Sequence, residues 1–360
     1  MTQAAWHMDA LISLRRRGFI GALGAASLLA ACGQSRAPGA LAMVEFGGFT
    51  MGSVYTVKIV GRWVSQALQS AARDAVAAAL DAVDTAMSTH RPQSELSRFN
   101  AHPGGSPFAL SPDMASVFTL ARQVSVSTAG AFDVTVGPVV DAWGFGPGRR
   151  ERVVGDCELA ALERRVGWKR LRLDERAGTI WKADPRVRAD LSGIAKGYGV
   201  DKAAQGLDAL GIEHYLIEAG GEVRTRGQNA QGRPWQVAIE QPQPGPRRPR
   251  YLVPLSGLAM ATSGDYRIFF ERDGRRYSHE IDPATARPID NRLTSVSVVA
   301  ASGALADALG KLIVLGPEKA YARALSLGVA AHFIVREPDG TLRDVTTPAF
   351  AALGGRLLQA

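Results

Sequence analysis

The sequence predicts an α+β fold, with mixed or antiparallel sheets flanked by helices. Stretches whose apolar residues recur at helical spacing lie among short stretches that alternate or are rich in β-branched residues. The two kinds do not alternate strictly along the chain, whereas a doubly wound parallel sheet would need a regular strand–helix alternation. The 360 residues, 46% of them hydrophobic, are enough to bury a sizeable core.

The first 31 residues are typical of an export signal and are set apart from the fold. Arg15, Arg16 and Arg17 precede an apolar run over 19–31, which is shorter than the about 20 residues that a membrane-spanning helix needs. The letters RRGFI at 16–20 resemble a twin-arginine signal. We therefore expect export, with the general secretory route as the alternative to the twin-arginine one.

The letters LAAC at 29–32 resemble a lipobox, in which the cysteine takes up lipid and becomes the first mature residue. Cys32 is the predicted lipidation site, and a cleaved signal with a chance cysteine is the alternative. Residues 1–31 are then a signal, 32–42 a tether, and 43–350 one domain that the lipid holds to a membrane in the periplasm. Cys157 would be left alone, so neither an intramolecular disulfide nor a cysteine-based metal site is expected.

The predicted domain opens with an alternating stretch over 43–60, which indicates a hairpin with Gly47-Gly48 or Gly52 at its turn. Apolar residues at helical spacing and good start signals predict the helices, as at 111–128, which begins with Ser-Pro-Asp. The predicted helices are 64–88, 111–128, 156–166, 195–210, 304–314 and 317–327. The predicted strands are 170–174, 179–182, 214–218, 235–240, 251–256, 258–262, 266–272, 275–281, 293–300, 331–336 and 342–346. Polar loops are expected at 88–100 and, where the chain is Pro-rich, at 241–250.

The net charge of +8 comes from basic residues that are scattered along the chain. No basic stripe interleaved with aromatic residues is present, so nucleic-acid binding is not expected. Solvated arginines explain most of the excess, although it can also help to attract an anionic ligand.

The stretch DLSGIAKGY at 190–198 combines a turn with the start of a helix. Backbone N–H groups near Ser192 and Gly193 would attract an anion at the helix N-terminus. Lys196, in the first turn, opposes the helix dipole, which makes sense if an anion lies beside it. Ordinary helix capping is the alternative, since many helices begin with Ser-Gly.

Three further segments carry polar or glycine-rich patterns. The letters GAFDVTVGP at 130–138 and WGFGP at 143–147 would suit a slot for a planar ring, or core packing. EAGGE at 218–222 ends a strand in a paired-glycine turn. The stretch 261–288 contains TSGDY and SHEIDP, a density of hydroxyl, imidazole and carboxylate groups that suits gripping a phosphate and moving a proton.

Taken in order, these segments resemble the ApbE family of FAD:protein FMN transferases, also known as thiamine-biosynthesis-type lipoproteins. The motifs are MGSVY at 51–55, MSTHRPQSELSRFN at 87–100, GAFDVTVGP, DLSGIAKGYGVD, EAGGE and TSGDY with SHEIDP. The resemblance runs from about residue 43 to residue 335. It implies a reaction in which FAD is cleaved, FMN passes to a threonine hydroxyl of a partner flavoprotein, and AMP is released with the help of Mg²⁺. An exported member also resembles proteins that serve periplasmic respiratory reductases, so a respiratory membrane protein is one candidate acceptor.

The resemblance also implies roles for individual residues. His279 matches the histidine that takes the proton from the incoming threonine, and an imidazole suits that task near neutral pH. A hydrogen-bonded strand histidine is the alternative. The positions that match FAD-binding ones are Met51, His90, Ala131, Phe132, Asp133, Asp190, Lys196 and Ile281. The positions that match metal-binding ones are Gly193, through its carbonyl, Asp307 and Lys311.

Lys311 is the main departure from the family pattern, which has a metal-binding threonine four residues after the aspartate. An ammonium offers no lone pair and repels a dication. Three outcomes are open: an ion pair with Asp307 that blocks the metal, a direct contact with the pyrophosphate, or a turn into solvent while Mg²⁺ binds through Asp307, carbonyls and phosphate. Glu280 replaces a usual apolar residue and is expected to face out of its strand, and Ala286 replaces a glycine with little expected effect.

Three functions follow from these residues. The first is FAD:protein FMN transfer. The second is FAD binding without catalysis, as a flavin carrier or scaffold whose metal site Lys311 has disabled. The third is hydrolysis of the FAD pyrophosphate, with water in place of the threonine.

Overall fold

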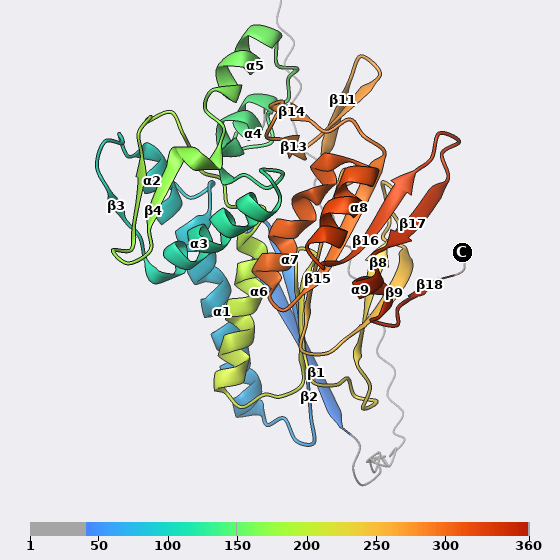
Figure 1. The fold of residues 1–360 in the computed structure, drawn as a ribbon. Helices are drawn as coiled ribbons and strands as arrows, with labels where there is room; N and C mark the ends of the chain where they lie inside the picture. Colours follow the sequence, from blue (N-terminus) through green and yellow to red (C-terminus); the bar gives the residue numbers. More distant parts are fainter. Residues whose placement is uncertain (1–40, 149, 359–360) are drawn as a thin grey trace, which may run out of the picture. The chain divides into compact units, whose positions relative to one another are not determined.

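Eight antiparallel strands form the central sheet (Figure 1), as the α+β prediction requires. The computed structural model describes residues 41–358 with the exception of residue 149. The sheet order is β1-β2-β6-β7-β10-β15-β16-β17, and each neighbouring pair runs antiparallel. The strands are β1 (Ala42–Thr50), β2 (Ser53–Gly61), β6 (Tyr215–Ala219), β7 (Glu222–Arg226), β10 (Ala259–Gly264), β15 (Leu293–Ala300), β16 (Ala330–Arg336) and β17 (Leu342–Thr346).

The β1–β2 hairpin confirms the first predicted element and places its turn at Met51-Gly52. Both turn residues have positive φ, 45° for Met51 and 70° for Gly52, which is the conformation of a tight hairpin turn. The Gly47-Gly48 pair lies inside β1 instead. The inner face of the hairpin buries residues such as Val57 and Ile59 against the helices.

Helices cover one face of the sheet. They are α1 (Gln66–Met87), α6 (Ala195–Ala209), α7 (Gly303–Gly310), the 3₁₀ helix η3 (Lys311–Leu315) and α8 (Pro317–Ser326). Ser65 begins α1, where its side chain accepts a hydrogen bond from the Leu68 N–H. Side chains along β15 alternate between the two faces of the sheet. Val296 and Val298 pack in the core under the helices, and Val299 packs in the core on the other face.

Helices α6 and α7 cross at two glycines. A Cβ atom on Gly197 would lie 2.2 Å from the Gly303 carbonyl oxygen, and one on Gly303 would lie 2.5 Å from the Gly197 oxygen. Only two residues without side chains permit so close a backbone contact. This crossing fixes the start of α6 against the helix that carries Asp307.

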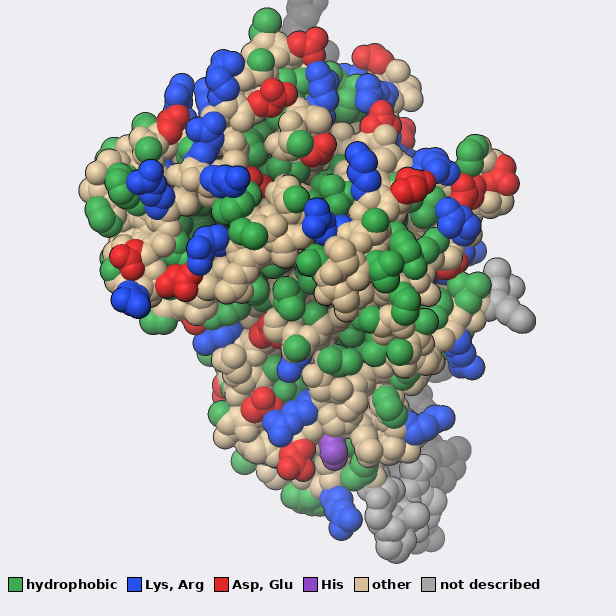
Figure 2. All heavy atoms as spheres, in the orientation of Figure 1, with side chains coloured by type: hydrophobic (Ala, Val, Ile, Leu, Met, Phe, Trp, Pro, Cys, Tyr) green, Lys and Arg blue, Asp and Glu red, His purple; other side chains and the backbone are tan. Residues whose placement is uncertain are grey.

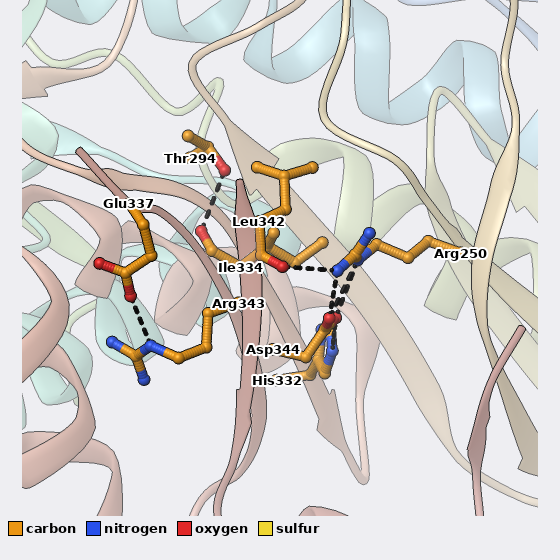
Figure 3. A network of polar contacts seen from close by, with 8 residues as sticks. All are labelled: Arg250, Thr294, His332, Ile334, Glu337, Leu342, Arg343 and Asp344. Atoms are coloured by element: carbon orange, nitrogen blue, oxygen red, sulfur yellow. Dashed lines mark hydrogen bonds and ion pairs between the residues drawn. The ribbon is translucent and has the colours of Figure 1, made fainter. Parts of the chain in front are cut away.

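A three-stranded sheet of β8 (Trp235–Glu240), β9 (Pro249–Leu255) and β18 (Arg356–Leu357) packs on the other face, next to helix α9 (Pro348–Ala351). Figure 3 shows the polar network that ties it to the edge of the central sheet: Arg250 on β9 binds Asp344 on β17, and Asp344 also binds His332 on β16. The Nε and Nε2 atoms lie 3.0 Å and 2.9 Å from the carboxylate oxygens. His332 is fully buried, so the network is part of the core.

Residues between α1 and α6 form a cap beside the helical layer (Figure 1). Its elements are α2 (Glu95–Ala101), β3 (Phe108–Ala109), α3 (Pro112–Ser127), η1 (Val134–Val136), α4 (Gly137–Trp143), α5 (Asp156–Glu163), η2 (Trp168–Arg170), β4 (Leu171–Asp174) and β5 (Thr179–Lys182). Helix α2 lies where a polar loop was predicted, because Ser94 caps it by accepting from the Ser97 N–H. Gly137 and Pro138 begin α4, since Pro fits the first turn of a helix.

The predicted strand 275–281 is interrupted at its end. The structure has β11 (Phe269–Arg272) and β12 (Arg275–Ser278) as a hairpin, then β13 (Ile281–Asp282) paired with β14 (Arg287–Pro288). His279 and Glu280 lie in the link between β12 and β13. Ala286, at φ 50°, takes the left-handed conformation that a glycine would adopt without strain, and its carbonyl accepts from Trp143 Nε1.

The predicted signal, tether start and lipidation site at Cys32 lie outside the described residues. Within the described part, no helix is long and apolar enough to cross a membrane. Acidic and basic side chains are interspersed over the face drawn in Figure 2.

Candidate active site

A cluster of buried charges lies where four elements meet: the start of α6, the start of β7, the end of α7 with η3, and the link between β12 and β13. It contains two lysines, three carboxylates and one histidine. The carboxylates are almost completely buried, with exposed fractions of 2% for Glu222, 3% for Glu280 and 5% for Asp307. So many buried charges are costly unless they are paired, and they are typical of functional sites.

Lys196, in the first turn of α6, forms an ion pair with Glu222 at the start of β7. Burial by itself would lower the pKa of Lys196, but Glu222 and then Asp307 outweigh it, so the pKa is raised and the ammonium stays charged. Burial raises the pKa of Glu222 to about 7, against the opposing effect of Lys196. The Glu222 Oε2 atom is buried with no hydrogen-bond partner among the described residues.

Asp307, near the end of α7, accepts a hydrogen bond at Oδ2 from the Gly197 N–H over 3.1 Å. The close crossing of α6 and α7 makes this contact possible. Burial raises the pKa of Asp307, while Lys196 and Lys311 act in the opposite direction. The predicted metal-binding aspartate therefore lies beside the helix start that carries the predicted phosphate-binding lysine.

Lys311 neither pairs with Asp307 nor turns into solvent. Its Nζ lies 2.9 Å and 2.8 Å from the two oxygens of Glu280. The prediction that Glu280 faces out of its strand is wrong: its side chain is buried and its carboxylate pairs with Lys311. Burial would raise the pKa of Glu280, but Lys311 and His279 together lower it.

His279 lies next to this pair, with 28% of its side chain exposed. Its Nδ1 lies 3.1 Å from the Ile268 carbonyl oxygen, which can only accept, so Nδ1 carries the hydrogen. The lone pair is then on Nε2, which lies 3.7 Å from Glu280 Oε1. Burial lowers the pKa of His279 and favours the neutral ring that a general base needs.

The turn before α6 closes the cluster on one side. A Cβ on Gly193 would lie 2.9 Å from Lys311 Cε and 3.6 Å from Phe132 Cε2, so this glycine lies against two other predicted site residues. Asp190 accepts from the Ser192 N–H over 2.8 Å, so that N–H is not free for a phosphate as the sequence suggested. Helix α6 begins later than the turn, at Ala195.

The remaining predicted positions surround this centre at differing depths. Met51 reaches α6, because a Cβ on Gly199 would lie 3.0 Å from Met51 Cε. Ile281 is buried in the apolar cluster of α4 and β11. His90 is exposed, and both His90 and Asp190 lie close enough to Asp141 to influence the pKa of its carboxyl group.

The predicted nucleotide-contacting stretch is buried. Ala131 and Phe132 are 6% and 4% exposed. Asp133 accepts from the Thr135 N–H and hydroxyl and from the Trp168 N–H. These bonds fix the loop between α3 and η1, so the side chain of Asp133 is already occupied in holding it.

Among the described residues, no group of three or more His, Cys, Asp and Glu side chains is arranged to hold a metal ion alone. The carboxylate donors that lie together are those of Asp307 and Glu222, and the Glu222 Oε2 atom has no hydrogen-bond partner among the described residues. Mg²⁺ commonly binds through one or two carboxylates together with substrate phosphates and water. The residues therefore fit a magnesium ion that the substrate helps to hold.

Two residues of the cluster were missing from the sequence prediction. Glu222 belongs to the EAGGE turn, which was interpreted as a simple turn, and the unusual second acid after two glycines was its signal. Glu280 was noticed only as a departure. Both departures, Glu280 and Lys311, meet as a single ion pair.

Residues 51–333 of this chain match a protein-family model described as "ApbE family". A FAD:protein FMN transferase of Haemophilus influenzae is 41% identical over 304 residues, which cover 83% of this chain and 88% of that protein. The one from Vibrio cholerae is 42% identical over 329 residues, which cover 90% and 95%.

Solved structures agree with these sequence matches. The flavin transferase ApbE from Vibrio cholerae superposes with a TM-score of 0.79 at 39% identity, covering 87% of this chain and 99% of that one. The apo form of the Pseudomonas stutzeri flavinyl transferase ApbE gives 0.78 at 40% identity, covering 87% and 97%.

Proposed function

The chain belongs to the ApbE family, and on that premise we propose how its residues perform the family's reaction. It is a FAD:protein FMN transferase. The reaction joins FMN to a threonine hydroxyl of an acceptor flavoprotein through a phosphoester. The observation that carries the assignment of residues is the buried cluster of His279, Glu280, Lys311, Asp307 and Lys196 around the turn at Gly193.

His279 is the general base in this proposal. Its Nε2 lone pair takes the proton of the threonine hydroxyl while the oxygen attacks the FMN phosphorus. The bond between that phosphorus and the bridging oxygen breaks, and AMP leaves with the bridging oxygen. The imidazolium that results faces Glu280 Oε1 at 3.7 Å, which stabilises the new positive charge.

Asp307, Gly193 and Glu222 are the proposed oxygen donors to Mg²⁺. When bound, the ion would neutralise charge on the pyrophosphate and on the leaving AMP. Lys196 keeps Glu222 in place and adds positive charge beside the turn. Met51, His90, Ala131, Phe132, Asp133, Asp190 and Ile281 remain the proposed flavin- and nucleotide-binding positions.

The test uses the processed protein with FAD, Mg²⁺ and an acceptor flavoprotein domain that carries a threonine flavinylation site. Covalent flavin fluorescence on the acceptor after denaturing electrophoresis, with one AMP released per label, is the expected result. AMP release without an acceptor would indicate the pyrophosphatase. FAD binding with no AMP under any divalent cation would indicate the non-catalytic carrier and would remove the transferase assignment.

We also propose that the protein is exported and anchored by lipid at Cys32. The support is the order of the N-terminal segments: paired arginines, a short apolar run and the LAAC letters. Incorporation of labelled palmitate in the bacterium, abolished by Cys32→Ser, is the expected result. Release of an unlabelled, cleaved protein would favour the ordinary signal.

A further inference from the structure

Lys311 has two carboxylates within its reach in the fold. Asp307 lies four residues earlier on the same helical segment, a spacing that normally lets opposite charges meet. Glu280 comes from another element, 31 residues earlier in the chain. The Lys311 ammonium donates to both carboxylate oxygens of Glu280, at 2.9 Å and 2.8 Å, and makes no ion pair with Asp307.

The path of the Lys311 side chain explains this choice. Helix α7 ends at Gly310, and Lys311 begins the 3₁₀ helix η3, so the regular i, i+4 alignment with Asp307 is lost. The stem then passes over Gly193, where a Cβ would come within 2.9 Å of Cε. A residue larger than glycine at position 193 would obstruct that path.

Glu280 also holds Lys311 firmly. Its carboxylate is 3% exposed, and among the described residues its hydrogen-bond donor is Lys311. His279 Nε2, at 3.7 Å, is too far for a hydrogen bond. If Lys311 turned to Asp307, Glu280 would remain as a buried carboxylate without a partner, which is strongly unfavourable.

We propose that Glu280 is a positioning residue that keeps the Lys311 ammonium away from Asp307, so that the Asp307 carboxylate stays available to a divalent cation. This inference rests on the proposed function in one respect, namely that the divalent cation binds at Asp307. The pair adds no net charge to the cluster. It therefore places a lysine beside the metal-binding carboxylate without neutralising that carboxylate.

Substitution of each partner separates their effects. Glu280→Gln keeps the shape of the side chain but releases Lys311, which then pairs with Asp307 and competes with the cation. Lys311→Met removes the competitor, and the double variant removes both charges. Glu280→Gln should weaken cation binding at least about tenfold, whereas Lys311→Met and the double variant should bind at least as tightly as the wild type.

Mn²⁺ is the probe, followed by electron paramagnetic resonance with saturating FAD and no acceptor protein, so that the readout is binding and not turnover. Lys202→Met is the matched control, because Lys202 pairs with Asp113 on α3, at 3.2 Å, and with none of the carboxylates of the cluster, so its loss should not change Mn²⁺ affinity. Thermal unfolding of each variant checks that it is folded.

Unchanged Mn²⁺ affinity in Glu280→Gln, or a double variant as weak as Glu280→Gln, would overturn the proposal. If Glu280→Gln does not fold, the double variant decides, because it leaves neither charge buried without a partner: weaker binding than the wild type would mean that the Lys311–Glu280 pair helps the cation and would overturn the proposal, and equal or tighter binding supports the role of Lys311 as a restrained competitor. Failure of the proposed function appears differently, as wild-type protein that binds no FAD with or without Mn²⁺.

Discussion

The crossing of α6 and α7 gives the sharpest prediction, because one backbone contact positions both the helix start and the metal-binding carboxylate. We consider Gly197→Ala. The new Cβ would lie 2.2 Å from the Gly303 oxygen, 2.4 Å from its carbon and 2.8 Å from the Ala304 nitrogen. All three are backbone atoms, so no side chain can rotate away, and the helices must separate.

The size of the effect follows from these distances. A separation of about 1 Å is needed to bring the contact near the van der Waals minimum. That movement would break the 3.1 Å bond from the Gly197 N–H to Asp307, worth about 1.5–3 kcal/mol for a charged acceptor. Overpacking adds about 1–3 kcal/mol, and the higher helix propensity of Ala returns about 1 kcal/mol. We expect a net loss of about 1.5–5 kcal/mol in the free energy of unfolding and a transfer rate lower by about a hundredfold, as small misplacements at a reacting centre cause.

Gly206→Ala, on the same helix, is the matched control. Its Cβ would meet Ala75 Cβ at 3.4 Å, an ordinary contact, so the helix gains about 0.5–1 kcal/mol and the transfer rate is unchanged. Urea unfolding gives the two free energies, and flavin labelling of the acceptor gives the rates. A Gly197→Ala protein as stable as the wild type would refute the claim that this contact sets the spacing of the helices.

The other predictions address the base, the remote network and pH. His279→Gln should lower kcat by about 10²–10⁴-fold while FAD affinity, measured by flavin fluorescence, changes little; loss of FAD binding would mean that the ring holds substrate instead. Asp344→Ala leaves Arg250 and the buried His332 without their carboxylate and should cost about 2–4 kcal/mol in urea unfolding, with no change in transfer rate. Burial raises the pKa of Asp265 from 3.8 to about 6, so its stabilising contribution is fully present below pH 3.8 and is lost as pH rises through about 6. Between pH 4 and 7 this titration should lower the free energy of unfolding of the wild type by at most about 3 kcal/mol. Asp265→Asn should remove this pH dependence, and an equal dependence in the variant would contradict the assignment.

Local patterns were enough to predict most of the fold. The strand predicted over 293–300 is β15 with the same bounds, and Gly52 was one of the two turn positions that the sequence left open for the first hairpin. The pattern failed where a short element depends on a cap or on a partner far away in sequence. The polar residues over 88–100 made α2 look like a loop although Ser94 caps it, and the chain leaves β12 before Glu280, whose carboxylate pairs with Lys311.

For the candidate site, too, sequence patterns predicted some features and could not predict others. Residues such as His279, Lys196 and Asp307 were found through motifs that the family shares, and their meeting in one cluster agrees with that prediction. Whether Lys311 pairs with Asp307 was undecidable from the i, i+4 spacing, since the answer depends on the end of α7 and on the absent side chain at Gly193. The pairing partner of a buried charge is a property of the tertiary structure.

The charge balance of the cluster leads to one further expectation. Each lysine is held by a buried carboxylate, Lys196 by Glu222 and Lys311 by Glu280, and Asp307 remains as an unpaired negative charge. Among the described residues of the cluster neither lysine is without a carboxylate partner, and the Asp307 carboxylate would repel a pyrophosphate. FAD binding should therefore require a divalent cation before any chemistry occurs, and should weaken by at least about tenfold in EDTA. Equal affinity in EDTA and in Mg²⁺, measured by flavin fluorescence, would mean that one lysine leaves its carboxylate when the dinucleotide arrives.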